Sequence, residues 1–240
     1  MDLGLEGRVF VLTGATAGLG YAAAFALVHE GARVVVSSRS PARVEAAVSR
    51  LGRQAVGVAA AVEDPATPTL LVRTALRHYG RLDGALLATG PSARGRVCDA
   101  TDEQWRAHFD HLFLGLLRTA TTVAGHLPSG GAIAFVLSTS ARRPLPDFGL
   151  SDGLRPGLAM AARQMAAELG PDGIRVLSLV PGRFPTPGSP LSPDESCADI
   201  PLSRFGTPEE FGKVAAFSLS AAAGYVTGTE IVIDGGKLRC

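Results

Sequence analysis

Lysine and tyrosine are scarce in this sequence of 240 residues. Only two of its 23 cationic side chains are lysines, Lys213 and Lys237, and the others are arginine. Tyrosine occurs three times, at Tyr21, Tyr79 and Tyr225, and none of these is followed by a lysine four residues later. Chemistry that needs a tyrosine and a lysine one helical turn apart is therefore absent from the chain, however it is aligned with other proteins.

Cysteine, long apolar runs and excess charge are also lacking. Cys98, Cys197 and Cys240 are odd in number and far apart, which argues against a disulfide framework or a zinc site. No run of about 18 apolar residues occurs, so no membrane span is predicted. The first residues carry Asp2 and Glu6 and do not resemble a signal peptide, so we expect a cytoplasmic protein. A net charge of +1 gives no reason to expect nucleic acid or a membrane surface as a partner.

Short β-branched runs alternate with longer helical patterns along the whole chain. Several runs, such as Val9–Leu12 and Val34–Val36, are continuously apolar, which is typical of strands buried on both faces of a parallel sheet. Strands are predicted over 8–13, 33–38, 55–60, 84–89, 132–138, 174–180 and 230–234, and helices over 18–30, 41–52, 66–79, 102–127, 156–170 and 208–222. This order predicts a single α/β domain over residues 1–240, with a doubly wound, mostly parallel seven-stranded sheet and helices on both faces. The Pro- and Ser-rich segment 183–200 is predicted to be a mobile loop that includes a short helix.

A glycine-rich turn lies between the first predicted strand and the first predicted helix. It contains Gly14, Gly18 and Gly20. Glycines at these positions let the backbone turn tightly and approach a pyrophosphate, which then rests on the helix N-terminus. The alternative is a tight turn without a ligand. Because the turn stands between a strand and a helix, the sequence favours a nucleotide site.

At this point the chain resembles the short-chain dehydrogenase/reductase family over essentially its whole length. The matching motifs are TGxxxGxG at 13–20, Asp83, Trp105, Ser138, Pro181-Gly182 with Thr186, YVTG at 225–228 and DGG at 234–236. The resemblance implies a Rossmann-type oxidoreductase that transfers a hydride between a nicotinamide cofactor and a carbonyl or hydroxyl substrate. The residues that it implies as cofactor contacts are Gly14, Thr16, Gly18, Leu19, Gly20, Ser38, Arg39, Gly90, Pro181, Gly182 and Thr186.

The end of the second strand indicates which cofactor is preferred. An acidic residue at Ser38 would bind both ribose hydroxyls and repel a 2′-phosphate, whereas Ser38 followed by Arg39 can pair with that phosphate. We therefore predict NADP(H) over NAD(H), with Arg39 as an ordinary solvated cation as the alternative. Two departures from the family pattern, Ala61 near the adenine and LATG at 87–90, remove side-chain hydrogen bonds and point to weak binding.

The catalytic positions depart further from the family. The resemblance implies four catalytic residues: a tyrosine that protonates the substrate carbonyl, a lysine four residues later that lowers the pKa of the phenol and holds the nicotinamide ribose, a serine that orients the carbonyl and an asparagine that supports a proton relay. Only the serine is retained, as Ser138. Ser151 stands at the tyrosine position, Arg155 at the lysine position and Leu112 at the asparagine position. A serine hydroxyl is a far weaker acid than a phenol with a pKa of about 10, and it is a ring's length shorter. Losing a positioned general acid costs roughly 10²–10⁴ in rate, so impaired reduction is expected.

Pro156 bears on the backbone of the same segment. Proline is favourable at the first position of a helix and disruptive inside one. We therefore predict that the helix begins near Pro156 and that 151–155, together with Gly149 and Gly153, forms a loop. A kinked first helical turn is the alternative.

Arginines follow several of the predicted strands. Arg94, Arg96, Arg142, Arg143, Arg155 and Arg183 are predicted to converge on the crevice and to suit an anionic small-molecule ligand, with solvated surface arginines as the alternative. His108 and His111 lie one turn apart and could bind a metal or carry protons, but we interpret them as partly exposed helix residues and predict no metal site.

Three functions remain open. The first is a family oxidoreductase with impaired proton delivery, rerouted through Ser138, Asp147, Asp152 or water. The second is a non-catalytic nucleotide- or metabolite-binding protein, or an inactive partner of an active homologue. The third is a lyase or cyclase that uses the crevice without hydride transfer. The family resemblance also implies a homodimer or homotetramer formed through the helices at 102–127 and 156–170.

Overall fold

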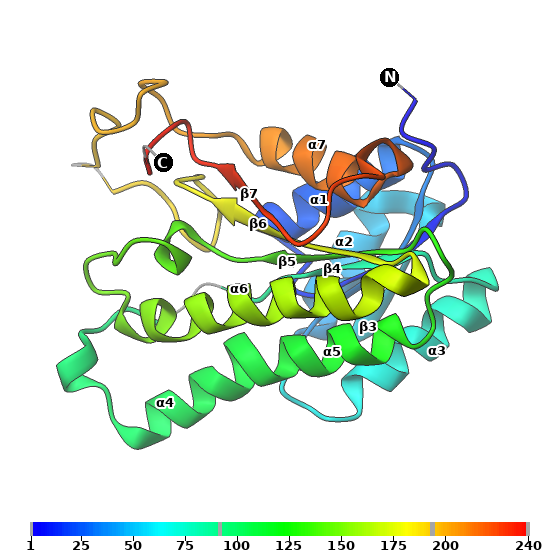
Figure 1. Cartoon of the computed structure of the whole chain (residues 1–240), viewed down its shortest axis with the longest axis horizontal. Coiled ribbons are helices and arrows are strands. Elements are labelled where there is room, and N and C mark those ends of the chain that lie inside the picture. Colours follow the sequence, from blue (N-terminus) through cyan, green and yellow to red (C-terminus); the bar gives the residue numbers. More distant parts are fainter. Residues whose placement is uncertain (1, 91–92, 193–194, 239–240) are drawn as a thin grey trace.

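The computed structural model describes residues 2–90, 93–192 and 195–238. These residues form one seven-stranded sheet with the strand order β3-β2-β1-β4-β5-β6-β7 (Figure 1). The strands are β1 (Val9–Leu12), β2 (Arg33–Ser38), β3 (Ala55–Ala59), β4 (Gly84–Leu87), β5 (Ala132–Val136), β6 (Arg175–Pro181) and β7 (Glu230–Ile233). Every pairing is parallel, so the predicted fold class is confirmed and the sheet is parallel throughout. The strand order reverses between β1 and β4, the point where doubly wound sheets bind ligands.

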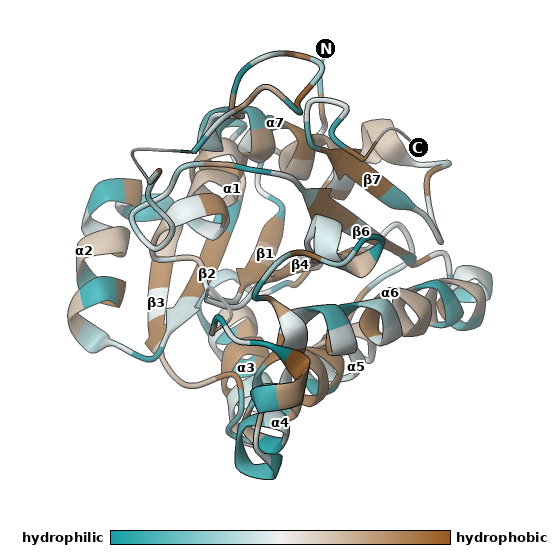
Figure 2. Cartoon of the chain, turned by 90° about the vertical axis from the view of Figure 1, so that its left-hand side faces the viewer, coloured by the Kyte–Doolittle hydropathy of each residue, from teal (hydrophilic) through white to brown (hydrophobic). Residues whose placement is uncertain are grey.

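Helices cover both faces of the sheet (Figures 1 and 2). They are α1 (Gly18–His29), α2 (Pro41–Leu51), α3 (Thr67–Tyr79), α4 (Asp102–His108), α5 (Gly115–Ala124), α6 (Gly149–Leu169) and α7 (Pro208–Leu219). Five short 3₁₀ turns lie at 52–54, 97–99, 139–141, 170–172 and 221–223. The spacing of Thr101 with Gln104 and of Thr207 with Glu210 predicts a capping box at each of these helix starts, and both are confirmed, at the starts of α4 and α7. No helix in the described residues is long and apolar enough to cross a bilayer.

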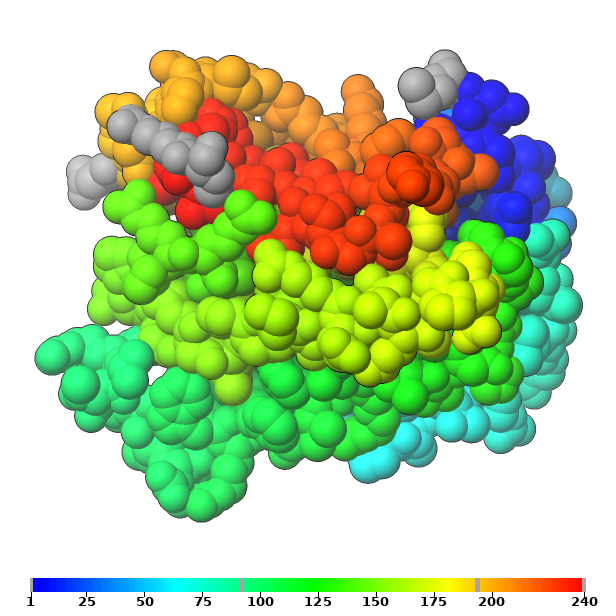
Figure 3. All heavy atoms as spheres, viewed as in Figure 1, coloured from blue at the N-terminus to red at the C-terminus, as the bar shows by residue number. Residues whose placement is uncertain are grey.

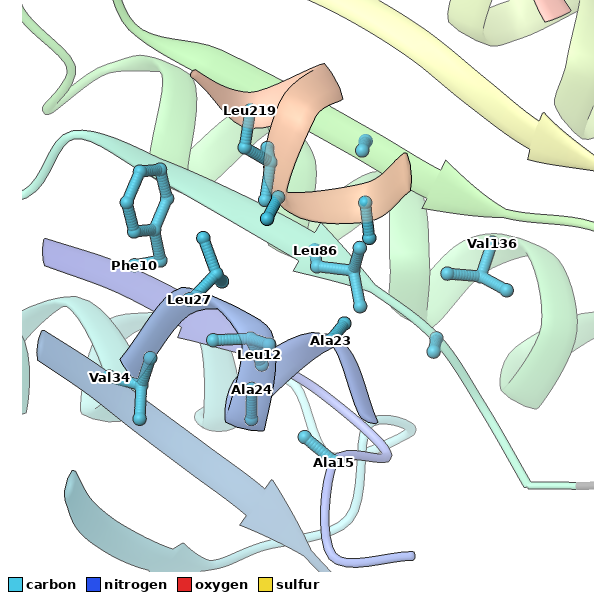
Figure 4. Packing of buried hydrophobic residues seen from close by; sticks show 14 of the residues in the cluster. Phe10, Leu12, Ala15, Ala23, Ala24, Leu27, Val34, Leu86, Val136 and Leu219 are labelled. Atoms are coloured by element: carbon cyan, nitrogen blue, oxygen red, sulfur yellow. The ribbon is translucent and has the colours of Figure 1, made fainter. Parts of the chain in front are cut away.

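Two hydrophobic cores lie on opposite faces of the sheet because successive strand side chains point in opposite directions. Phe10 and Leu12 pack with Leu27 of α1 on one face, together with residues of α7 (Figure 4). Val9 and Val11 belong to the other core, which α3, α5 and α6 cover. The strands are therefore held from both sides, and their carboxyl ends are fixed as the rigid base of the site.

Asp83 fastens the start of β4 to β1. Its buried carboxylate accepts hydrogen bonds from the Arg8 and Arg81 guanidinium groups and from the Val9 N–H, at 2.7–2.8 Å. Burial alone would raise the pKa of Asp83, but these hydrogen bonds outweigh it and hold the pKa below its ordinary value of 3.8. The charged form is therefore part of the folded structure.

The predicted start of α6 was wrong. The helix begins at Gly149, seven residues earlier than expected, and Pro156 lies inside it with its ring exposed. Tertiary packing explains the difference. Ser151 and Arg155 lie one turn apart on the buried face of the helix, so the segment is held against the sheet despite the proline. Gly153 is not a loop residue either: a Cβ there would lie 2.6 Å from Cη2 of Trp105, so it is a point of close helix packing.

The predicted helix at 102–127 is interrupted by a π-helical turn, Phe109–Leu114, between α4 and α5. The segment 183–200 contains no helix in its described residues, contrary to the prediction, and residues 193 and 194 lie outside the described part. β7 is an edge strand, and Figure 3 shows the C-terminal segment, in red, on the surface between α6 and α7.

Candidate functional site

A cleft of about 1060 Å³ lies at the carboxyl ends of the strands. It is lined by the segments that follow β1, β2, β4, β5 and β6, and by the first turns of α6. All the predicted cofactor positions line it: Gly14, Thr16, Gly18, Leu19, Gly20, Ser38, Arg39, Gly90, Pro181, Gly182 and Thr186. The structure brings them together, while their role as cofactor contacts stays a prediction.

The glycine-rich turn has the shape of a phosphate cradle. Gly14 has a φ of +58°, and a Cβ on it would lie 2.8 Å from the Ala88 carbonyl oxygen. A Cβ on Gly20 would lie 2.4 Å from the Gly14 carbonyl oxygen, so larger residues would fill the turn. α1 begins inside this turn, and its N-cap residue, Ala17, supplies no side-chain hydrogen bond. The first N–H groups of α1 are therefore left for a ligand or water, as an anion site requires.

Two contacts hold the neighbouring loops against this turn. The Thr13 hydroxyl donates to the Ala88 carbonyl at 2.7 Å and accepts from the Ala88 N–H at 2.9 Å, which ties the end of β1 to the end of β4. A Cβ on Gly18 would lie 3.4 Å from the side chain of Thr186, so the loop after β6 also reaches the turn. The cradle is thus closed by three segments that are distant in the sequence.

The end of β2 carries more positive charge than was predicted. Ser38 and Arg39 line the cleft, and so do Arg43 and Arg50 of α2. The guanidinium of Arg50 lies 4.3 Å from the centroid of the Tyr21 ring. Arg43 lies in the first turn of the helix predicted after this strand, and that place in the sequence is a signal that could have identified it.

Three of the four predicted catalytic positions, Ser138, Ser151 and Arg155, line the cleft. The hydroxyls of Ser151 and Ser140 lie 2.9 Å apart, and Nε of Arg155 donates to the Ser151 oxygen at 2.9 Å. Nη1 of Arg155 donates to the Val136 carbonyl at 3.1 Å. Ser151 is only 2% exposed, so its hydroxyl is committed to protein partners. Sequence reasoning missed Ser140.

Arg155 is a buried cation. It is 8% exposed, and burial lowers its pKa to about 10. At neutral pH the guanidinium still carries its charge.

The fourth position, Leu112, is buried in the π-helical turn and is not among the cleft residues. An apolar side chain there offers no proton and no hydrogen bond.

No phenol lines the cleft within the described residues. Tyr21, Tyr79 and Tyr225 are all described, and none lines the cleft. The alternative carboxyl donors, Asp147 and Asp152, do not line it either. Asp152 instead accepts a hydrogen bond from the Leu145 N–H at 3.0 Å, while burial raises its pKa.

The predicted convergence of arginines is only half right. Arg94, Arg155 and Arg183 line the cleft, whereas Arg96, Arg142 and Arg143 do not. Arg96 pairs with Asp99 at 3.8 Å, and Arg142 pairs with Glu230 of β7 at 2.7 Å. A position after a strand places a residue at the correct edge of the sheet but does not decide where a long side chain points.

The two histidines have separate partners. Nδ1 of His108 is 2.9 Å from the Gln104 carbonyl oxygen, and Nδ1 of His111 is 2.6 Å from the Glu63 carboxylate. Burial lowers the pKa of His111 more than the Glu63 charge raises it. Among the described residues, no group of three His, Cys, Asp or Glu side chains is placed to hold a metal ion.

Comparison with known proteins agrees with this architecture. A family model described as Enoyl-(Acyl carrier protein) reductase matches residues 14–237. The human protein named dehydrogenase/reductase SDR family member 4 is 30% identical over 97% of this chain and 88% of its own length. The chain belongs to the short-chain dehydrogenase/reductase family. A second relative of this short-chain dehydrogenase/reductase, an uncharacterised oxidoreductase of Methylorubrum extorquens, is 34% identical over 97% of this chain and 98% of its own.

Solved structures of the family superpose closely. A dehydrogenase/reductase from Sinorhizobium meliloti 1021 has a TM-score of 0.93 at 27% identity and covers 98% of this chain and 97% of that one. A 3-ketoacyl-(acyl-carrier-protein) reductase from Brucella melitensis, complexed with NADH, has a TM-score of 0.89 at 27% identity. The match covers 97% of this chain and 99% of that one. The family resemblance predicted from the motifs is therefore confirmed.

Proposed function

We propose that the protein binds NADP(H) in this cleft and is a short-chain oxidoreductase with impaired carbonyl reduction. The observation that carries the proposal is the state of Ser151, which stands at the tyrosine position. Its hydroxyl is buried and engaged by Ser140 and Arg155, so it cannot also serve as a proton donor of phenolic acidity.

The cradle supports nucleotide binding. Gly14 and Gly20 leave the space that a Cβ would occupy, and α1 presents an uncapped N-terminus beside them. These residues would hold a pyrophosphate, and a bound nicotinamide would supply the hydride. Ser138 would donate a hydrogen bond to the substrate oxygen, since its own hydroxyl already accepts from the Ser140 N–H at 3.2 Å. Positioning survives in this arrangement, whereas acid catalysis worth roughly 10²–10⁴ in rate does not.

Arg39 and Arg43 support NADP(H) as the preferred cofactor. Arg39 follows β2 and Arg43 lies in the first turn of α2, and both line the cleft with Ser38, which stands where an acidic residue would repel a 2′-phosphate. Ala61 leaves the adenine without a carboxylate, which supports binding that is weaker than is usual in the family.

The same observation supports a second candidate, a protein that binds nucleotide without turnover. A Ser151 hydroxyl that is engaged by Ser140 and Arg155 is as consistent with a binding protein that has no activity as with an impaired enzyme. Only a sensitive activity measurement separates the two.

The test is a fluorescence titration with NADPH and NADH. It is followed by assays that measure the oxidation of NADPH in the presence of a panel of ketones. We expect tighter binding of NADPH than of NADH and slow or no turnover. Ser151→Tyr combined with Arg155→Lys is expected to raise turnover, and Ser138→Ala is expected to remove any residual turnover of the natural protein. Failure to bind either nucleotide, or rapid ketone reduction by the natural protein, would refute the proposal. Product formed without cofactor oxidation would favour a lyase or cyclase instead.

The proposal includes a homodimer or homotetramer. Phe109 beside α4 is 41% exposed and Met160 on α6 is 60% exposed. The Phe109 ring stacks on Phe113 at 5.2 Å between centroids, which forms an apolar surface on the side where α4, α5 and α6 lie next to one another (Figures 1 and 3). Such a surface is expected to be buried between subunits. Light scattering with Met160→Glu as the disrupted variant would test it.

A further inference from the structure

Arg94 is a cationic residue of the cleft whose guanidinium has no polar partner. It follows β4, its side chain is exposed, and it lines the cleft. Across the part of the chain that the structure describes, no carboxylate pairs with it and no acceptor takes a hydrogen bond from it. The guanidinium instead lies over the ring of Phe148, with 5.0 Å between Cζ and the ring centroid. A guanidinium on an aromatic face keeps its N–H donors available at the edge of the stack.

The other cationic residues at this end of the cleft already have a role. The cationic side chains that line the cleft where β4 to β7 end are Arg94, Arg155, Arg183 and Lys237. Arg183 forms an ion pair with Glu195, and Lys237 forms one with Asp199 at 2.9 Å. Arg155 stands at the position that the family resemblance assigns to the nicotinamide ribose. A ligand can therefore engage Arg94 without displacing a carboxylate of the protein or the cofactor.

Backbone contacts hold Arg94 beside the start of α6. The Gly95 N–H donates to the Asp147 carbonyl at 2.7 Å, and the Gly149 N–H donates to the Gly95 carbonyl at 3.0 Å. These bonds keep the segment after β4 next to Phe148, the residue before α6. Because α6 carries two of the predicted catalytic positions, the guanidinium lies at the same end of the cleft as those positions.

The cleft wall next to Arg94 is apolar. Leu145, Pro146 and Phe148 line the cleft on the loop after β5, and Pro187 lines it on the loop after β6. A ligand that fills this end would bury an apolar body against these side chains and meet a positive charge at Arg94.

We propose that Arg94, positioned by Phe148, is a specificity-determining residue that binds a carboxylate of the substrate, so that the substrate class is ketones with an apolar body and a carboxylate at the far end. Two N–H donors of a guanidinium match the two oxygens of a carboxylate. The ketone oxygen stays with the Ser138 hydroxyl, so each polar group of such a ligand has its own partner. This inference deepens the proposed function and rests on it for the placement of the ketone beside Ser138.

The test compares 4-acetylbenzoate with its neutral counterpart, 4-acetylbenzamide, because both carry a ketone and a second polar group at opposite ends of an apolar ring. Ligand-observed NMR gives both dissociation constants, with and without saturating NADPH. We expect the natural protein to prefer the acid about fivefold, which is the upper end of what an exposed ion pair contributes, and Arg94→Gln to abolish the preference. The preference should decrease as salt is added.

Arg96→Gln is the matched control. Arg96 lies two residues later, is also exposed, pairs with Asp99 at 3.8 Å and does not line the cleft, so the preference should survive in this variant. Phe148→Leu keeps an apolar wall but removes the aromatic face, and we expect it to weaken binding of the acid more than binding of the amide.

Several results would overturn the inference. They are equal affinity for acid and amide in the natural protein, an unchanged preference in Arg94→Gln, and an equal loss of preference in Arg96→Gln. Competition between 4-acetylbenzoate and NADPH would also overturn it, since the acid would then occupy the nucleotide site.

The two proposals fail separately. NADPH binding without a preference for the acid would leave the proposed function standing and remove the role of Arg94. A preference that depends on Arg94 in a protein that does not bind NADPH would do the reverse.

Discussion

Pro156→Ala is the substitution that most directly tests the structure of α6. Pro156 is the eighth residue of this helix and lacks the N–H that would bond the Asp152 carbonyl. In an isolated helix an interior proline is about 3 kcal/mol less favourable than alanine. In α6 the buried face already holds the helix against the sheet, so we expect a gain of about 2 kcal/mol in the free energy of unfolding, somewhat less than in a peptide.

The assay is thermal and urea denaturation followed by circular dichroism. A gain of about 2 kcal/mol corresponds to a rise in Tm of about 4–8 °C for a domain of this size. Pro208→Ala is the matched control, because Pro208 is the first residue of α7, where proline is favourable. That variant should be unchanged or slightly less stable. If Pro156→Ala behaves in the same way as Pro208→Ala, then α6 starts at residue 156 and the reasoning is wrong.

Three further outcomes are expected. Asp83→Asn should lower the free energy of unfolding by about 2 kcal/mol at pH 7. Because the folded pKa of Asp83 is depressed, the stabilisation by its carboxylate is present above pH 3.8 and is lost as the pH falls below that value. Urea denaturation between pH 2 and 5 should therefore show a smaller dependence of the unfolding free energy on pH in the variant, and an unchanged dependence would contradict this. Gly153→Ala should lower the free energy of unfolding by about 1 kcal/mol, since overpacking against Trp105 exceeds the gain in helix propensity. It should also shift the fluorescence emission of Trp105, the single tryptophan. Unchanged stability together with unchanged emission would show that the helices can separate freely. Arg39→Ala should weaken NADPH binding about tenfold and leave NADH binding nearly unchanged, with the exposed Arg53→Ala as control; equal loss for both nucleotides would rule out a 2′-phosphate contact.

Strand positions could be predicted because they depend on local apolar runs. β2 was predicted to the residue, and the other strands within a few residues, since continuous runs such as Val34–Val36 are favourable only when both faces are covered. The capping boxes at Thr101 and Thr207 are equally local, because each involves contacts within four residues. The cleft positions followed from the order of the motifs along a doubly wound sheet.

The start of α6 could not be predicted because its decisive contacts are distant in the sequence. Gly149, Gly153 and Pro156 all indicate a loop when considered locally. In the fold, Trp105 occupies the space over Gly153, and the buried side of the helix bonds to Val136 through Arg155. Tertiary packing therefore overrides the propensity of the segment.

The direction of long side chains is the second feature that could not be predicted from the sequence. The sequence placed six arginines at the correct edge of the sheet, but only contacts such as that between Arg142 and Glu230 of β7 show which of them turn away from the cleft. The bond between Ser140 and Ser151 was missed for the same reason, since the two residues are 11 apart and meet only after α6 packs.

The uncapped N-terminus of α1 has a consequence for how this protein can change. Ala17 leaves the first amides of the helix without a side-chain partner, and those same amides would receive a phosphate. The side chain of a serine or aspartate at that position would accept hydrogen bonds from these amides and so compete with the nucleotide phosphate for them. A substitution that stabilises the unliganded helix and one that favours phosphate binding therefore place opposite demands on residue 17.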